Sequence, residues 1–179
     1  MSKVLIISTS LRQNANSEIL AHEVERGAID AGHEVEFITL KDKDIKFCKG
    51  CMACQKLGKC VINDDANAIT IKMKESDVIV WATPVYYYEM SGQMKTLIDR
   101  ANSLYVTGFN FKDIYVITTS ADASDNVVQT VLFGLKGWCA CLPGTNIKGY
   151  INGGGLDNPN EVQSNKNLLD QAYNMGKTI

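Results

Sequence analysis

The stretch Val4-Leu5-Ile6-Ile7, followed by Ser8-Thr9-Ser10-Leu11-Arg12-Gln13-Asn14-Ala15-Asn16-Ser17, decides the fold of this chain. Its first four residues form an apolar run rich in β-branched side chains, long enough for a buried strand and too short for a helix. Apolar residues then recur at helical spacing, at Ile19, Leu20, Val24 and Ile29. A buried strand that leads through a polar loop into a helix directs unpaired N–H groups and the helix dipole at that loop. The stretch therefore predicts an anion site.

The polar loop Ser8–Ser17 contains no glycine, so it matches neither the dinucleotide-binding fingerprint nor the Walker loop. An anion must instead be held by side-chain hydroxyls, and Arg12 supplies a positive charge. The alternative interpretation is an ordinary loop in which Asn16 or Ser17 caps the following helix.

The composition is that of an ordinary globular domain. The chain has 179 residues, with 45% hydrophobic and 21% charged residues, and predicts one domain over residues 1–179. A net charge of −2 gives no reason to expect nucleic acid or an anionic membrane as a partner. The apolar run near the N-terminus is too short for a signal peptide, and no segment could span a bilayer, so a cytoplasmic protein is expected. Its six cysteines are then expected to bind metal, undergo redox chemistry or remain plain thiols.

Strand and helix patterns alternate along the rest of the chain. Further strands are expected at Glu34–Leu40, Asp77–Ala82, Asp113–Thr119 and around Ile147–Ile151. The strand Asp77–Ala82 should end at Thr83-Pro84, and the last strand at Gly153–Gly155. Helices are expected from Asp64-Asp65, over Ser91–Leu104 with Ser91 as N-cap, over Ser124–Cys139 and over Asn160–Met175. This alternation predicts an α/β three-layer sandwich, with a five-stranded parallel sheet of order 2-1-3-4-5.

Three of the predicted strands end in polar or special residues, at Ser8–Ser17, Thr83–Tyr88 and Thr118–Asp122. In the order 2-1-3-4-5 these three strands are neighbours, so the loops should converge. Ligands of such sheets bind beyond the carboxyl ends of the strands, at the switch point of the topology.

Two motifs in the middle of the chain indicate a family. Together with the loop Ser8–Ser17, the runs Pro84-Val85-Tyr86-Tyr87 and Ser91-Gly92-Gln93-Met94-Lys95-Thr96-Leu97-Ile98-Asp99-Arg100 resemble the flavodoxin-like NAD(P)H-dependent FMN reductases. Within that superfamily, Cys48-x2-Cys51-x2-Cys54-x5-Cys60 followed by Asp64-Asp65 resembles the iron–sulfur flavoproteins. The resemblance covers nearly the whole chain. It implies a flavodoxin-like fold, noncovalent FMN, and a homodimer or larger homo-oligomer formed across the flavin face.

The resemblance also implies site residues. Ser10, Arg12, Asn16 and Ser17 would hold the FMN phosphate, while Pro84, Val85, Tyr86 and Tyr87 would line the isoalloxazine ring and Ser120 with Ala121 would close its other side. Leu11 stands where the family usually has proline, and Ala15 where it often has glycine. A flavin needs an apolar slot with aromatic edges and backbone donors, which agrees with these loops. The alternative for Tyr86–Tyr88 is an exposed aromatic turn without a ligand.

The segment 41–62 is expected to be a cysteine-rich insertion. Cys48, Cys51, Cys54 and Cys60 have the compact spacing that holds a [4Fe-4S] cluster, whereas structural zinc favours two more widely separated pairs. Interleaved lysines, at Lys46, Lys49, Lys56 and Lys59, would lower the thiol pKa values and offset cluster charge. A cluster, free or redox-active thiols, and zinc all remain open. Cys139 and Cys141 are expected to be buried small hydrophobes at a helix end.

The predicted function is that of an FMN-dependent oxidoreductase, which passes reducing equivalents from NAD(P)H to a small acceptor such as free flavin or a quinone. Because hydride transfer to a flavin needs no acid–base side chain, no catalytic residue is assigned. One alternative is an iron–sulfur flavoprotein that exchanges single electrons with a ferredoxin-like partner. A second is a metal or redox sensor built on the cysteine loop, without turnover.

Overall fold

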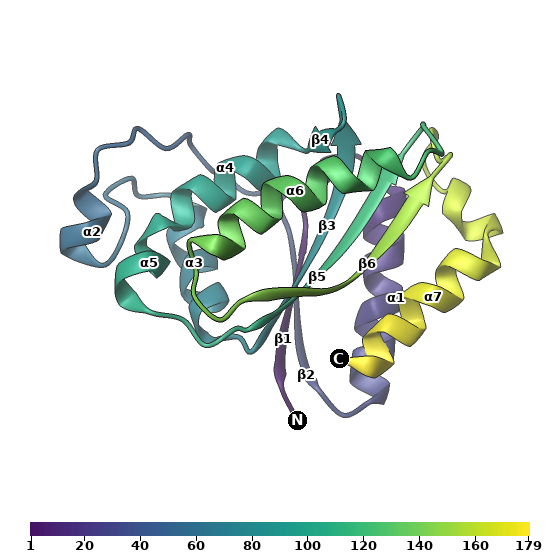
Figure 1. Cartoon of the computed structure of the whole chain (residues 1–179), viewed down its shortest axis with the longest axis horizontal. Helices are drawn as coiled ribbons and strands as arrows, with labels where there is room; N and C mark the ends of the chain where they lie inside the picture. Colours follow the sequence, from purple (N-terminus) through teal and green to yellow (C-terminus); the bar gives the residue numbers. More distant parts are fainter.

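A computed structural model describes all residues from 1 to 179, and its centre is a parallel β-sheet (Figure 1). Five strands run parallel in the order β2-β1-β3-β5-β6. Their bounds are β1 Lys3–Ser8, β2 Glu34–Thr39, β3 Val78–Tyr86, β5 Asp113–Ser120 and β6 Asn146–Gly154. The predicted flavodoxin-like arrangement is thus confirmed, but the count of five strands is wrong. A sixth strand, β4 (Glu89–Met90), pairs antiparallel with the end of β3.

Helices cover both faces of the sheet (Figure 1). One face packs against α1 (Asn16–Asp30) and α7 (Lys166–Thr178), and the other against α3 (Asp65–Glu75), α4 (Gly92–Arg100) and α6 (Asn126–Ala140). Strand β1 serves both cores because successive side chains of a strand point to opposite faces. Leu5 and Ile7 belong to the larger core, and Val4 and Ile6 to the smaller one. This burial on two sides explains why the strand sequence is continuously apolar.

Strand β3 runs two residues beyond the proline at which it was expected to break. It pairs with β1 only as far as Ala82, whereas its pairing with β5 continues to Pro84 and Thr119. The Ala82 carbonyl points toward β1, where it accepts from Thr9 N. Residues two apart in a strand direct their backbone groups to the same side, so the nitrogen of Pro84 also faces β1. The pairing of β3 with β1 ends at Ala82, before Pro84 is reached. Pro84 therefore interrupts no ladder hydrogen bond.

Three helix predictions need correction. The segment Ser91–Leu104 is divided into α4, the 3₁₀ turn η1 (Ala101–Ser103) and α5 (Leu104–Thr107). The last helix begins at Lys166, because the Asn165 side chain caps it, and a separate turn η2 (Glu161–Ser164) precedes it. The segment expected to be irregular over Lys41–Cys60 contains the short helix α2 (Ala53–Leu57), which lies at the outer edge of the molecule (Figure 1).

Helices α1 and α7 approach each other closely at two glycines. A Cβ atom on Gly27 would lie 2.0 Å from the Tyr173 carbonyl oxygen, and one on Gly176 would lie 2.1 Å from that of Val24. This contact fixes α7, and with it the loop that follows β6. None of the helices combines the length and apolar character that crossing a bilayer would require.

Candidate functional site

The three loops that were predicted to converge line one hollow of about 170 Å³ at the carboxyl edge of the sheet. Nine of the ten residues proposed from the resemblance lie in its wall; Tyr87 does not. The complete lining is Ser10, Arg12, Ala15, Asn16, Ser17, Pro84, Val85, Tyr86, Thr119, Ser120, Ala121, Leu156, Asp157 and Pro159.

Helix α1 begins at the hollow without a side-chain cap. Its N-cap residue is Ala15, so the alternative interpretation, in which Asn16 or Ser17 caps the helix, is wrong. The Asn16 amide instead donates to the Asn158 carbonyl at 2.8 Å and accepts from Val162 N at 3.1 Å. The Ser17 hydroxyl is buried and has no hydrogen-bond partner. Buried hydroxyls are normally hydrogen-bonded, so an orphaned one beside free helix N–H groups marks a place for an anion.

A wall of the hollow comes from the loop after β6, which sequence reasoning missed. Arg12 Nη1 donates to the Asp157 carbonyl at 2.8 Å, and Asn160 N donates to the Asn14 carbonyl at 3.1 Å. Leu156, Asp157 and Pro159 thereby face the loop Ser8–Ser17. The signal available was the fifth strand itself, because its carboxyl end lies at the same edge of the sheet as the other three.

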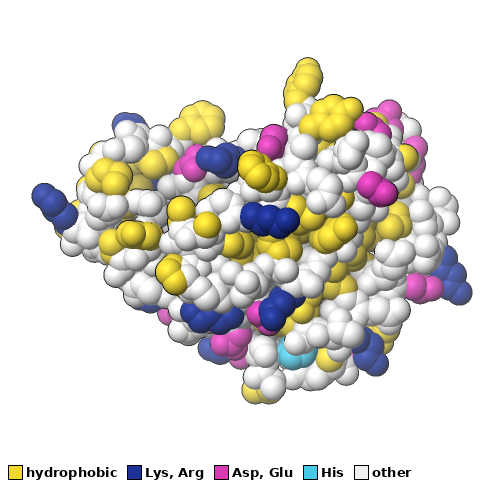
Figure 2. Space-filling view, in the orientation of Figure 1, with side chains coloured by type: hydrophobic (Ala, Val, Ile, Leu, Met, Phe, Trp, Pro, Cys, Tyr) yellow, Lys and Arg dark blue, Asp and Glu magenta, His cyan; other side chains and the backbone are white.

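The hairpin between β3 and β4 carries three exposed tyrosines at the mouth of the hollow. Tyr86 is 51% exposed, Tyr88 is 53% exposed, and the Tyr87 side chain is fully exposed. Figure 2 shows hydrophobic side chains standing out from the surface in this region, next to β4. Both Tyr87 and Tyr88 adopt positive φ values, of 50° and 64°, which side-chain-bearing residues rarely do. Tyr87 is therefore presented to solvent and is not part of the wall of the hollow.

Contacts of Tyr88 bind this hairpin to the neighbouring loop. Its hydroxyl donates to Asp122 at 2.9 Å, and the Thr130 hydroxyl donates to its carbonyl. The hydrogen bond to Asp122 raises the pKa of Tyr88. The Asp122 pKa is lowered, mainly by the backbone N–H of Ser124 and then by the Tyr88 hydroxyl. These contacts join two loops that border the hollow.

Ser91 connects the start of helix α4 to Thr9, which follows β1, and to Thr83 of β3. Its hydroxyl lies 2.9 Å from that of Thr9 and accepts from Met94 N, as expected for an N-cap. Its backbone N–H donates to the Thr83 hydroxyl at 3.0 Å. The start of α4 is consequently fixed to the ends of both β1 and β3.

The four cysteines of the segment 41–62 are free thiols with different exposure. Cys48 and Cys51 are exposed, whereas Cys54 and Cys60 are half-buried. No three Cys, His, Asp or Glu side chains converge in a geometry that would hold a metal ion. Three of the four sulfurs nevertheless accept N–H groups, Cys48 from Gly50 N, Cys54 from Asn102 Nδ2 and Cys60 from Arg100 Nε, at 3.4, 3.2 and 3.3 Å.

The two cysteines outside the segment 41–62 differ in burial. Cys139 is buried, as expected, and burial raises its thiol pKa. The expectation that Cys141 is buried is wrong, because it follows the last residue of α6 and is exposed to solvent.

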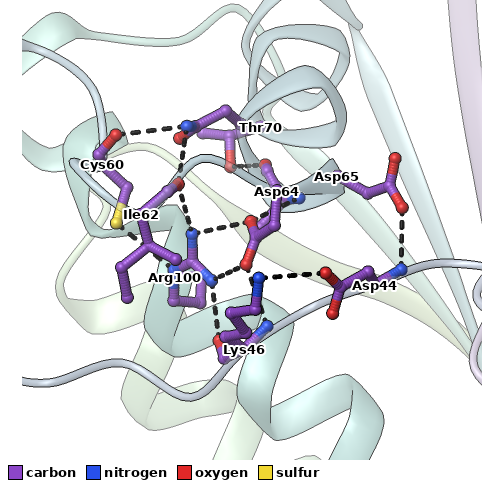
Figure 3. Close-up of polar contacts among 10 residues, drawn as sticks. Asp44, Lys46, Cys60, Ile62, Asp64, Asp65, Thr70 and Arg100 are labelled. Atoms are coloured by element: carbon purple, nitrogen blue, oxygen red, sulfur yellow. Dashed lines mark hydrogen bonds and ion pairs between the residues drawn. The ribbon is translucent and has the colours of Figure 1, made fainter.

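An ion pair between Arg100 and Asp64 joins the end of the cysteine-containing segment to helix α4 (Figure 3). Both side chains are completely buried, and the guanidinium meets the carboxylate through two hydrogen bonds, of 2.5 and 2.8 Å. Burial alone would raise the pKa of Asp64, but hydrogen bonds from Arg100 and from Lys46 N lower it overall. The Lys95–Asp99 pair on the same helix is exposed, at 2.7 Å.

Comparison with known proteins identifies the family of the chain. The family model described as NADPH-dependent FMN reductase matches residues 2–151. An iron-sulfur flavoprotein of Methanocaldococcus jannaschii is 33% identical over 184 residues, which cover 99% of this chain and 95% of that protein. This similarity confirms the predicted likeness to iron–sulfur flavoproteins.

Two solved structures share the fold. An NAD(P)H:quinone oxidoreductase from Methanothermobacter marburgensis superposes with a TM-score of 0.73 at 14% identity, covering 99% of this chain and 96% of the other. An azoreductase from Bacillus anthracis also gives a TM-score of 0.73, at 15% identity, and covers 100% of both chains. The chain belongs to the NADPH-dependent FMN reductase family, and it is an FMN-dependent NAD(P)H oxidoreductase.

Proposed function

We propose that the hollow between Ser8–Ser17, Thr83–Tyr88 and Thr118–Asp122 is the FMN site of this oxidoreductase. The observation that carries the proposal is the buried, unpartnered Ser17 hydroxyl at the uncapped start of α1. A phosphate placed there would satisfy that hydroxyl, the first N–H groups of the helix and the Ser10 hydroxyl. Asn16 would contribute its backbone N–H, since its side chain is engaged by Asn158 and Val162. Arg12 would add positive charge at the rim.

The hollow is too small to enclose the whole of FMN, so part of the cofactor would lie outside it. A volume of about 170 Å³ lies below the roughly 300–1,000 Å³ of pockets that enclose a whole drug-sized ligand. The phosphate end would fill the hollow, and the ring would lie at its mouth. There Pro84, Val85, Tyr86 and Tyr87 would line one side, and Ser120 with Ala121 the other. A ring at the mouth stays accessible to NAD(P)H and to a small acceptor, for which we propose a flavin or a quinone.

The chemistry of the reaction belongs to the cofactor, since FMN accepts hydride from NAD(P)H and passes the electrons on. This chain's own residues bind and orient. The Tyr88–Asp122 contact holds the two ring-lining loops together. Ser91 fixes the start of α4 to Thr9 and Thr83, at the ends of β1 and β3. The exposure of three neighbouring tyrosines, Tyr86, Tyr87 and Tyr88, supports a homodimer or larger homo-oligomer. In it, a second copy of the chain would cover these side chains.

The test is turnover by the FMN-loaded protein. The purified protein is loaded with FMN, freed of excess, and mixed anaerobically with NADPH or NADH and a water-soluble quinone. We expect pyridine nucleotide oxidation to depend on both the bound FMN and the quinone. A protein that binds FMN but reduces no quinone or flavin would contradict the proposed acceptor class, while failure to bind FMN would contradict the site.

The cysteine insertion supports a second function, one-electron transfer through an iron–sulfur cluster. We propose that Cys48, Cys51, Cys54 and Cys60 are the ligands of a [4Fe-4S] cluster within the insertion 41–62 of a single domain 1–179. The chemistry of the donor set fits, because three of the four sulfurs accept N–H groups, as cluster thiolates do. Four lysines, Lys46, Lys49, Lys56 and Lys59, offset negative charge there. A ferredoxin-like protein would then be the electron partner.

An anaerobic absorbance spectrum with iron and flavin analysis tests this second function. We expect iron and FMN in the wild type, loss of iron with retained FMN in Cys51→Ser, and no loss in Cys141→Ser. Cys141 is the matched control because it is also an exposed thiol but lies outside the insertion. Full iron in Cys51→Ser would contradict the ligand assignment, and a wild type that takes up no iron on reconstitution would contradict the cluster.

A further inference from the structure

We infer that Arg100 is a positioning residue for the cysteine loop, and that it acts with Asn102 by donating N–H groups to two of the ligand sulfurs. The inference rests on the cluster proposed above. It goes beyond that proposal because it assigns to helix α4, whose sequence belongs to the flavin motif, the task of holding and tuning the second redox centre.

The Arg100 guanidinium uses all of its donors in one place. A guanidinium has five N–H groups, and Arg100 makes five hydrogen bonds. Two go to Asp64, two go to the carbonyls of Lys46 and Ile62 at 2.7 and 3.1 Å, and one goes to Cys60 Sγ at 3.3 Å. In Figure 3 the Cys60 sulfur points toward this guanidinium.

These partners lie at both ends of the cysteine run. Lys46 comes two residues before Cys48, while Cys60 and Ile62 lie at the end of the run and just beyond it. Asp64 accepts from Lys46 N at 2.9 Å and caps α3 by accepting from Ala66 N at 3.1 Å. One buried arginine therefore closes residues 46–64 into a loop and joins that loop to α3 and α4.

Because the contacts of Arg100 are buried, they tolerate few other side chains at this position. The side chains of both Arg100 and Asp64 are fully buried, and a buried charge that loses its partner is strongly unfavourable. A lysine in place of Arg100 keeps one positive charge but lacks the planar fork, so it can satisfy only part of the set. The geometry thus depends on arginine itself and not on charge alone.

A second N–H donor comes from the turn that follows α4. Asn102 Nδ2 lies 3.2 Å from Cys54 Sγ and donates to it. Hydrogen bonds to ligand sulfurs stabilise the more negative, reduced form of a cluster and so raise its reduction potential. Arg100 and Asn102 together supply such bonds to the two half-buried sulfurs, those of Cys54 and Cys60.

The other end of α4 is fixed to the proposed flavin loops. Ser91 contacts Thr9 and Thr83 there, and the helix has nine residues, a length of about 13 Å. The cysteine loop and the flavin loops are consequently attached to opposite ends of one short rigid helix. This arrangement fixes the separation of the two redox centres, which a freely moving insertion could not do.

The test compares Arg100→Lys, Arg100→Gln and Asn102→Ala with the wild type after anaerobic reconstitution with iron and sulfide. Lys95→Gln is the matched control, because Lys95 lies on the same helix in an exposed pair with Asp99. Three quantities are measured on each protein: FMN content, the rate of iron loss to a chelator, and the cluster reduction potential from a spectroscopic titration.

We expect all variants to keep FMN. Arg100→Gln should lose iron about 10- to 100-fold faster than the wild type, as outer-shell substitutions commonly do, with Arg100→Lys in between. Asn102→Ala should keep iron but show a lower reduction potential, and Lys95→Gln should match the wild type. A role of Arg100 in folding alone would move neither the potential of Arg100→Lys nor that of Asn102→Ala.

The outcomes separate the two claims. If the wild type holds iron, and Arg100→Lys and Asn102→Ala hold it as firmly and at the same potential, the inference is overturned while the cluster stands. If Arg100→Gln does not fold, Arg100→Lys and Asn102→Ala still decide the question. A wild type that takes up no iron overturns the proposed cluster, and this inference with it.

Discussion

Arg12 and Asp157 lie 145 residues apart in the sequence, yet Arg12 Nη1 donates to the Asp157 carbonyl at 2.8 Å. This bond, together with the contact of Asn160 N with the Asn14 carbonyl, joins the first loop of the chain to the last one. The proposed phosphate site is therefore walled by both ends of the domain. Packing of α7 against α1 holds the second wall in place.

Replacing Ser17 by alanine should weaken FMN binding without destabilising the protein. The Ser17 hydroxyl has no partner of its own, so its removal leaves no new orphan in the flavin-free protein. A hydrogen bond to a charged group contributes about 1.5–3 kcal/mol, so affinity should fall by about 10-fold or more. Fluorescence titration of the flavin-free protein with FMN measures this.

Ser8→Ala is the matched control for that experiment. Its hydroxyl is also buried and unpartnered, but Ser8 does not line the hollow. We expect the affinity for FMN to be unchanged. Equal losses in both variants, or no loss in Ser17→Ala, would remove Ser17 from the site.

Arg12→Ala should lower FMN affinity most at low ionic strength. Arg12 is exposed at the rim of the hollow, and salt screens exposed charges over about 10 Å at 0.1 M. The difference in binding free energy between variant and wild type should shrink as salt rises. Arg26→Ala serves as control, since Arg26 is an exposed residue of α1 that pairs with Glu23 at 2.5 Å. An Arg12→Ala protein that binds FMN like the wild type at low salt would exclude Arg12 from the phosphate site.

The Asp64–Arg100 pair should make stability depend on pH in acid. The folded-state pKa of Asp64 lies below its ordinary 3.8, so the pair contributes fully above pH 3.8. That contribution is lost as pH falls from 3.8 through the folded pKa. Asp64→Asn leaves the buried Arg100 without its counter-charge and should cost about 3–5 kcal/mol of unfolding free energy at pH 7.

Urea unfolding of wild type and Asp64→Asn at several pH values measures this effect, and the difference between them should narrow below pH 3.8. Asp99→Asn is the control, because its pair with Lys95 is exposed and worth at most about 1 kcal/mol. A difference that stays constant from pH 7 into acid would show that the pair does not depend on the Asp64 charge.

Tyr87→Asn should stabilise the protein. Tyr87 has a φ of 50° and a fully exposed side chain, so it carries backbone strain without packing in return. Asparagine tolerates this conformation better, and the left-handed region costs other residues about 1–2 kcal/mol. We expect the unfolding free energy to rise by up to about 1 kcal/mol, and FMN affinity to fall because Tyr87 is proposed to line one side of the ring. Tyr105→Asn, an exposed tyrosine in helical α5, should give no stabilisation.

The parallel sheet and the convergence of its loops were predictable because they follow from repeated, local signals. Each buried strand is a short apolar run, and each polar strand end points to the same edge. Strand β4 was not predictable, since it has only two residues and follows a turn formed by Tyr87 and Tyr88. Tyrosine is not among the residue types that usually form turns. The division of the predicted helix after Arg100 was not predictable either, since the apolar spacing continues through Ala101 and Leu104.

The wall formed by Leu156, Asp157 and Pro159 shows the limit of reasoning from local pattern. Nothing in those residues alone indicates an anion site; their position follows from bonds to Asn14, Arg12 and Asn16 across the whole chain. The exposure of Cys141 is of the same kind, because a thiol after a helix end is buried or exposed according to what packs on it. The clamp of Arg100 on the cysteine loop was likewise invisible from spacing.

The most direct test of the central claim, that the hollow at the start of α1 holds the phosphate of FMN, compares FMN with riboflavin, which lacks that phosphate. Both are titrated into the flavin-free protein by fluorescence quenching. We predict that FMN binds at least about 10-fold more tightly, because charge-assisted hydrogen bonds to the phosphate each contribute about 1.5–3 kcal/mol. In Ser17→Ala this advantage should decrease. Equal affinities for FMN and riboflavin in the wild type would contradict the account.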